Sequence, residues 1–163
     1  MIGTHLHRQR GSYSVEYAFS IGIFLFLLFA IIETGRILYT WSALNLVTQR
    51  GARVATVCPV NDELIAQIAV FGSGENNTSK IIPGVDSGNI SLSYFDEVGA
   101  PSSAYADIKY VNVSITDYTH ELLIPLILNE STVNNLLAPT FSTTLPVESL
   151  GYNPSSESRV CFA

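Results

Sequence analysis

Basic residues are scarce in most of this chain. Its 163 residues carry a formal net charge of −6, and beyond Arg53 only Lys80, Lys109 and Arg159 are basic. Binding to nucleic acid needs a dense basic surface that displaces counterions from the phosphates. The composition therefore excludes nucleic acid as a partner of the region after Arg53.

Groups that support catalysis or metal binding are also few. His120 is the only histidine outside the first eleven residues, and a lone histidine beside an apolar run is usually a structural residue. The sequence has no G-x-S-x-G nucleophile elbow and no phosphate-binding Gly-Lys-Ser/Thr motif. We therefore expect no enzyme activity, no cofactor and no metal. A weak calcium site is a minor alternative, formed by acids from two adjacent pairs, Asp62/Glu63 and Asp96/Glu97.

Only two cysteines are present, Cys58 and Cys161. Without histidine partners they do not form a zinc site. They would form one disulfide if this part of the chain lies outside the cytoplasm. Such a bridge closes a loop of about a hundred residues and would stabilise the fold by about 4–5 kcal/mol in the chain-entropy model. The alternative is a pair of unrelated buried thiols.

One long apolar run near the N-terminus dominates the sequence. Residues 15–32 carry a single charge, and as a helix they would span about 27 Å, close to the ~30 Å of bilayer hydrocarbon. The run lacks the A-x-A-like site of a secretory signal, and residues 21–32 lack the polar stripe of a soluble core helix. We therefore predict a transmembrane helix, with Arg8 and Arg10 keeping its N-terminus in the cytoplasm.

The single charge in this run is Glu16. A carboxylate at the start of a membrane helix is energetically expensive and points to a function. The alternative is that Glu16 lies at the headgroup level, where the helix dipole favours negative charge.

The residues around Glu16 read RQRGSYSVEY and lead directly into the apolar run. This resembles the class III prepilin signature, in which a membrane-embedded prepilin peptidase cuts after the glycine. The resemblance implies a leader of residues 1–11 and a cut between Gly11 and Ser12. It also implies an assembly role for Glu16 and Tyr17, in which the carboxylate pairs with the new α-amine of a neighbouring subunit.

The residues after the apolar run strengthen the resemblance. Residues 33–39 (ETGRILY) and 51–55 (GARVA) are similar to the E-x-G-R-x-x-Y and G-A-R-x-A elements of TadE-like pseudopilins from tight-adherence (Tad/Flp) systems. The similarity covers about residues 8–57, and after Cys58 it concerns only the general layout. It implies a minor pilin that is processed by a prepilin peptidase and helps to assemble a Flp-type adhesion pilus.

This resemblance also implies partners and a location. The partners would be the prepilin peptidase, other pilin and pseudopilin subunits, the inner-membrane assembly platform and membrane lipid. The chain would span the bacterial inner membrane once, with residues 58–163 as a periplasmic domain in which Cys58 and Cys161 can pair. The alternative is an unprocessed, single-pass membrane-anchored binding or sensor module.

Apolar periodicity predicts the rest of the fold. Apolar residues recur every three or four positions from Ile37 to Val54, so the helix should continue to about residue 57. Short helices are expected at residues 61–71 and 132–137, and strands at residues 89–95, 108–118 and 140–147. We therefore predict an α+β, pilin-like fold. In it, a long N-terminal helix over 12–57, transmembrane and then amphipathic, packs on a small antiparallel β-sheet of three or four strands.

Overall fold

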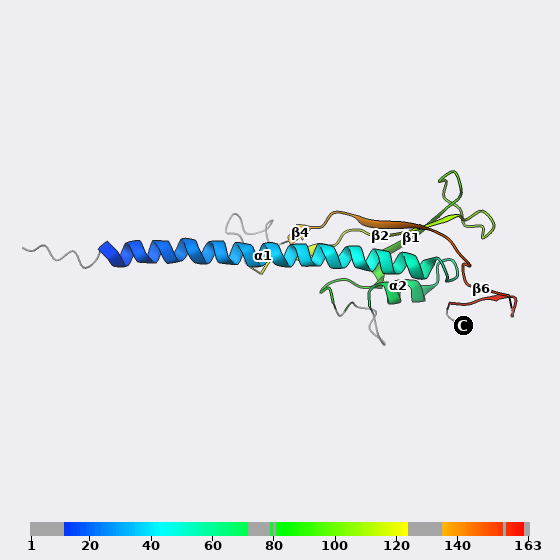
Figure 1. The fold of residues 1–163 in the computed structure, drawn as a ribbon, viewed down its shortest axis with the longest axis horizontal. Helices are drawn as coiled ribbons and strands as arrows, with labels where there is room; N and C mark the ends of the chain where they lie inside the picture. Colours follow the sequence, from blue (N-terminus) through cyan, green and yellow to red (C-terminus); the bar gives the residue numbers. More distant parts are fainter. Residues whose placement is uncertain (1–11, 72–78, 80, 124–134, 155, 162–163) are drawn as a thin grey trace, which may run out of the picture. The chain divides into compact units, whose positions relative to one another are not determined.

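The structure is a computed structural model that describes residues 12–71, 79, 81–123, 135–154 and 156–161. The predicted leader, residues 1–11, lies outside the described residues. The chain divides into two compact units, Met1–Arg36 and Ile37–Ala163. One continuous helix, α1 (Ser12–Ala55), belongs to both units (Figure 1). It ends two residues before the predicted end, ahead of Pro59.

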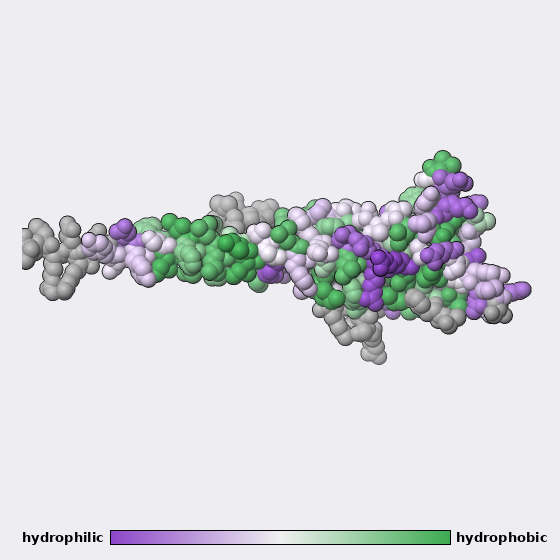
Figure 2. Space-filling view, in the orientation of Figure 1, coloured by the Kyte–Doolittle hydropathy of each residue, from purple (hydrophilic) through white to green (hydrophobic). Residues whose placement is uncertain are grey.

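In the first unit, α1 has exposed apolar side chains on all of its faces. Phe19 and Ile31 are more than 70% exposed, although they lie on different faces of the helix. The few hydroxyl groups bond locally: Ser20 donates to the Glu16 carbonyl at 3.0 Å and Thr34 to the Ala30 carbonyl at 2.8 Å. The backbone and these hydroxyls are thus satisfied within the helix, as a lipid environment requires. Among the described residues, α1 alone is long and apolar enough to cross a membrane (Figure 2).

The second unit packs the remainder of α1, Ile37–Ala55, with one short helix and several strands. The other elements are α2 (Glu63–Ala69), the 3-10 helix η1 (Ser87–Asn89), β1 (Ile90–Phe95), β2 (Tyr110–Ile115), β3 (Thr119–Glu121), β4 (Asn135–Leu137), β5 (Phe141–Pro146), β6 (Tyr152–Asn153) and β7 (Ser158–Arg159). The main sheet is antiparallel with the order β1-β2-β5, and β3-β4 and β6-β7 form two-stranded pairs.

Strand alternation gives the main sheet an apolar face and a polar face. On the inner face Tyr94, Val111 and Leu145 lie in one row across the three strands. On the outer face the corresponding rows consist mainly of serine, threonine and asparagine, such as Ser93-Asn112-Thr144. This one-sided pattern is typical of an antiparallel sheet with one face on the core and one face in water.

The inner face of the sheet packs on α1. Leu44 and Val47 are fully buried, and burying a side chain of this size stabilises the fold by about 1.5–3 kcal/mol. Thr48 and Thr143 place their hydroxyl oxygens 3.0 Å apart, which joins α1 to β5. The structure therefore confirms the predicted α+β arrangement of a long helix on a small antiparallel sheet.

The prediction of a helix at residues 132–137 is wrong for residues 135–137, the part of this range that the structure describes. Asn135–Leu137 forms β4, which pairs with β3 so that Leu136 lies opposite His120. An apolar run this short fits a helical turn or a strand equally well, and a partner strand distant in sequence decides between them.

Candidate functional site

The predicted processing and assembly residues lie at the N-terminal end of α1. Gly11 is outside the described residues, and α1 begins at the next residue, Ser12. Glu16 follows one helical turn later, so Ser12 and Glu16 share one face of the helix. Glu16 and Tyr17 are both exposed, and Tyr17 is 69% accessible. The described part of the chain therefore leaves most of this side chain uncovered.

The E-x-G-R element forms an ion pair at the end of the apolar run. Arg36 donates to Glu33 at 2.8 Å, one helical turn away. Glu33 is only 9% exposed, so the pair also offsets the desolvation of its carboxylate. A Cβ on Gly35 would meet nothing within 4 Å among the described residues, so packing against them does not require a glycine there.

The G-A-R-x-A element is a packing motif. A Cβ on Gly51 would lie 3.0 Å from the Ala69 Cβ of α2 and 3.1 Å from Val113 Cγ1 of β2. Ala52 and Ala55 are fully buried. Small residues at these three positions therefore let α1 approach both α2 and the sheet closely.

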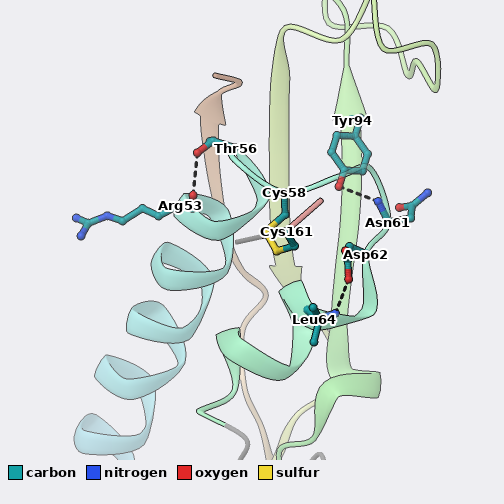
Figure 3. The surroundings of a disulfide bond; sticks show 8 residues. All are labelled: Arg53, Thr56, Cys58, Asn61, Asp62, Leu64, Tyr94 and Cys161. Carbon is teal, nitrogen blue, oxygen red and sulfur yellow. Dashed lines mark hydrogen bonds between the residues drawn. A yellow bond between two sulfur atoms is a disulfide. The ribbon is translucent and has the colours of Figure 1, made fainter. Parts of the chain in front are cut away.

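A disulfide joins Cys58, just after α1, to Cys161 near the C-terminus, as predicted (Figure 3). Their Cα atoms are 4.4 Å apart and their sequence separation is 103 residues. Next to the bridge, the Thr56 hydroxyl donates to the Arg53 carbonyl at 2.8 Å in the last turn of α1. The bridge thus fixes the C-terminal segment beside the end of the helix.

Tyr94 lies close to the disulfide on the inner face of the sheet (Figure 3). Its phenol oxygen accepts a hydrogen bond from the Asn61 backbone N–H at 3.1 Å. Burial raises the pKa of Tyr94 above its ordinary value of 10, and the hydrogen bond from Asn61 only partly opposes this shift. The neutral phenol is therefore the form that fits the folded domain.

The adjacent acidic pairs form caps and turns. Asp62 accepts a hydrogen bond from Leu64 N at 2.9 Å and caps α2. Asp96 accepts from Val98 N at 2.9 Å and from Ala100 N at 2.8 Å. Within the described ranges, no three His, Cys, Asp or Glu side chains converge on a point where a metal could bind.

One feature of the second unit, Ile37–Ala163, was not predicted from the sequence. A cavity of about 830 Å³ lies beside the end of β5 and the β6-β7 pair. Its aromatic and basic lining includes Tyr105, Tyr110, Tyr152 and Arg159. These residues come from separate segments, so neither spacing nor periodicity in the sequence connects them.

Comparison with known proteins identifies the first part of the chain. The model of the TadE-like protein family matches residues 11–53. The matched region includes the glycine of the predicted cleavage site, the Glu33–Arg36 pair and Gly51. No curated protein and no solved structure matches the chain. The similarity therefore concerns α1 and does not extend to the domain that follows.

Proposed function

The chain belongs to the TadE-like protein family through residues 11–53, and on this premise we propose that it is a minor pilin-like subunit of a Tad/Flp pilus system. One observation supports this most strongly: the first half of α1 exposes apolar side chains on all faces. Such a surface needs lipid, the helices of other subunits, or both in turn. A pilin-like subunit meets these two environments in succession, first in the membrane and then in the fibre.

Processing by a prepilin peptidase is the first step of this proposal. The basic leader, residues 1–11, stays in the cytoplasm, and a cut between Gly11 and Ser12 places a new α-amine at the first residue of α1. Glu16 lies one turn away from that amine on the same helix face. The carboxylate then pairs with the α-amine of an adjacent subunit, which orients α1 during assembly into an adhesion pilus.

A groove on the first half of α1 supports packing against another helix. Its lining includes Ala18, Gly22 and Phe26, and Ser14 precedes Ala18 by the same four-residue step. A Cβ on Gly22 would meet nothing within 4 Å in the part of the chain that the structure describes. Small residues four apart let helix backbones approach closely in a membrane. We place the α1 helix of a neighbouring pilin or pseudopilin subunit in this groove.

Membrane orientation and the location of the domain follow from the same proposal. The chain spans the inner membrane once, with the Ile37–Ala163 unit in the periplasm or on the assembled pilus. Its further partners are the prepilin peptidase and the inner-membrane assembly platform. The disulfide agrees with an extracytoplasmic location, because bridges of this kind persist in oxidising compartments.

The N-terminus and intact mass of the protein from native membranes test the proposal. Strains with and without the prepilin peptidase are compared, and we expect a chain that starts at Ser12 only when the peptidase is present. Gly11→Ala should block the cut and Glu16→Ala should impair assembly. Gly35→Ala is the matched control, since the same substitution lies outside the cleavage motif and its Cβ meets no described residue within 4 Å.

An unprocessed, single-pass binding or sensor module is the second candidate function. The cavity in the C-terminal domain favours it, because a binding module needs such a site. A chain that starts at Met1 in both strains would support this candidate and contradict the pilin-like proposal.

A further inference from the structure

The cavity beside β5 combines aromatic rings with charges of both signs. Tyr105, Tyr110 and Tyr152 line it and are 39%, 40% and 50% exposed. Lys109 and Arg159 contribute positive charge, and Glu97 and Glu148 contribute negative charge. Its volume of about 830 Å³ falls in the range of ligand sites of ~300–1,000 Å³.

Arg159 holds two of these rings in place. Its guanidinium carbon lies 3.9 Å from the centre of the Tyr105 ring and 5.6 Å from the centre of the Tyr152 ring. Its Nη1 donates to the Leu150 carbonyl at 3.0 Å. The Tyr105 hydroxyl also accepts a hydrogen bond from Val60 N at 3.3 Å. Two of the three rings, Tyr105 and Tyr152, are therefore already ordered, so a ligand would not have to immobilise them.

The base of the cavity is anchored to the end of α1. Glu148 N and Leu150 N both donate to the Thr56 carbonyl, at 3.1 and 3.2 Å. Gly151 has a φ of +76°, and a Cβ there would lie 2.6 Å from the Pro59 ring. The disulfide lies two residues beyond Arg159. The wall that carries Tyr152 and Arg159 is thus tied to the helix by hydrogen bonds, close packing and a covalent bond.

The charge balance of the lining selects a class of ligand. An anion would meet the carboxylates of Glu97 and Glu148, and a cation would meet Lys109 and Arg159. A wholly apolar ligand would desolvate all four charged groups without replacing their hydrogen bonds, which is costly. A neutral molecule with flat C–H faces and many hydroxyl groups avoids each penalty. Its faces stack on the tyrosine rings, while its hydroxyls donate to carboxylates and accept from the lysine.

We propose that this cavity binds neutral saccharides, with Tyr105, Tyr110 and Tyr152 as stacking surfaces and Glu97, Lys109 and Glu148 as hydrogen-bonding groups. The proposal does not depend on the proposed pilus function, because all these residues lie in the second unit, outside the family match. A saccharide-binding domain would serve a pilus subunit and a membrane-anchored binding module equally well.

Isothermal titration of the full-length, disulfide-bonded protein in lipid nanodiscs tests this proposal. The probes are cellotetraose, maltotetraose and N,N′-diacetylchitobiose, with inorganic phosphate and spermidine as charged comparisons. We expect at least one neutral oligosaccharide to bind at millimolar concentration, and the two charged probes not to bind. Tyr110→Ala should weaken this binding about tenfold, because it removes one stacking ring.

Two control variants separate binding from folding. Tyr110→Phe keeps the ring and should keep most of the affinity, while Tyr39→Ala removes an exposed tyrosine of α1 that does not line the cavity and should leave binding unchanged. Thermal unfolding of each variant checks the fold. The proposal is overturned if none of the oligosaccharides binds, if Tyr110→Ala binds as well as the unmodified protein, or if phosphate binds with the same dependence on Tyr110.

Discussion

The two halves of α1 share one backbone but have opposite surfaces. From Ser12 to Arg36 apolar side chains face every direction and are exposed. From Ile37 to Ala55 the helix buries one face, with Leu44 and Val47, and presents Gln49 and Arg53 to solvent. The second half is covered by its own domain, whereas the first half needs cover that the described chain does not supply.

Glycines make the same comparison at the level of single residues. Gly51 lies where α1, α2 and β2 meet, and a Cβ there would press on two neighbours. At Gly22 and Gly35 a Cβ would have no described residue within 4 Å. Gly51 therefore allows close packing inside the chain. Gly22 and Gly35 leave space on the surface of α1 that another molecule can approach.

Reducing the disulfide should give the largest loss of stability, and this loss should concern only the second unit, Ile37–Ala163. The bridge closes a loop of 103 residues, for which the chain-entropy model predicts a loss of about 4–5 kcal/mol in the free energy of unfolding. Chemical denaturation of the oxidised and reduced protein, followed by tyrosine fluorescence, measures this loss. The helical signal of residues 12–36 should persist, and its simultaneous loss would contradict the separation of the two parts of α1.

Gly51→Val should destabilise the domain by about 1–3 kcal/mol, since it forces extra atoms into a close-packed contact. Gly35→Val is the matched control, because a Cβ there has no described residue within 4 Å. Thermal unfolding of both variants measures the difference. Equal unfolding temperatures for the two variants would show that Gly51 is not the packing residue that the structure indicates.

Tyr94→Phe should have a smaller effect, which depends on pH. At neutral pH it removes the hydrogen bond from Asn61 and should cost about 1 kcal/mol. Because burial raises the pKa of Tyr94 in the folded state, the stabilising effect of its neutral form is complete below pH 10 and is lost as pH rises through the folded pKa. The denaturation curves of the two proteins should therefore differ at neutral pH and converge as the pH rises above 10. A gap that widens with pH would contradict this assignment.

Gly22→Leu should leave the stability of the domain unchanged, because Gly22 lies outside the second unit. It should still reduce incorporation into sheared pilus fractions, since it fills the groove proposed for a neighbouring helix. Leu28→Phe enlarges a residue on the opposite face of the same half, outside the groove, and incorporation should be retained. Immunoblots of membrane and pilus fractions make the comparison.

Elements with a periodic sequence pattern could be predicted from the sequence. Contacts between residues that are distant in the sequence could not. The long apolar run and the alternation of Val111, Val113 and Ile115 identify α1 and β2, because local patterns determine them. Strand β4 was missed because its pairing with β3 depends on a distant partner. The link between Tyr105 and Arg159 is similarly invisible, since the residues are far apart in sequence and meet only in the fold.

For the candidate site, the sequence identified the disulfide pair and the position of Glu16 at the head of α1. It did not indicate that Gly51 is buried between α2 and β2, because a short motif does not reveal which neighbours it contacts. The pairing of Glu33 with Arg36 was not predicted either, although their i,i+3 spacing on the expected helix already places the two side chains next to each other.

The disulfide also determines how the domain would carry mechanical load. Cys58 and Cys161 close a covalent ring, and α1 enters this ring at Cys58. Tyr110 lies about midway around it. If a ligand held at Tyr110 is pulled against a membrane- or fibre-bound α1, the tension divides between two chain segments of nearly equal length. The greatest distance between α1 and Tyr110 is then set by one segment, with or without the bridge, but each segment carries only about half of the force.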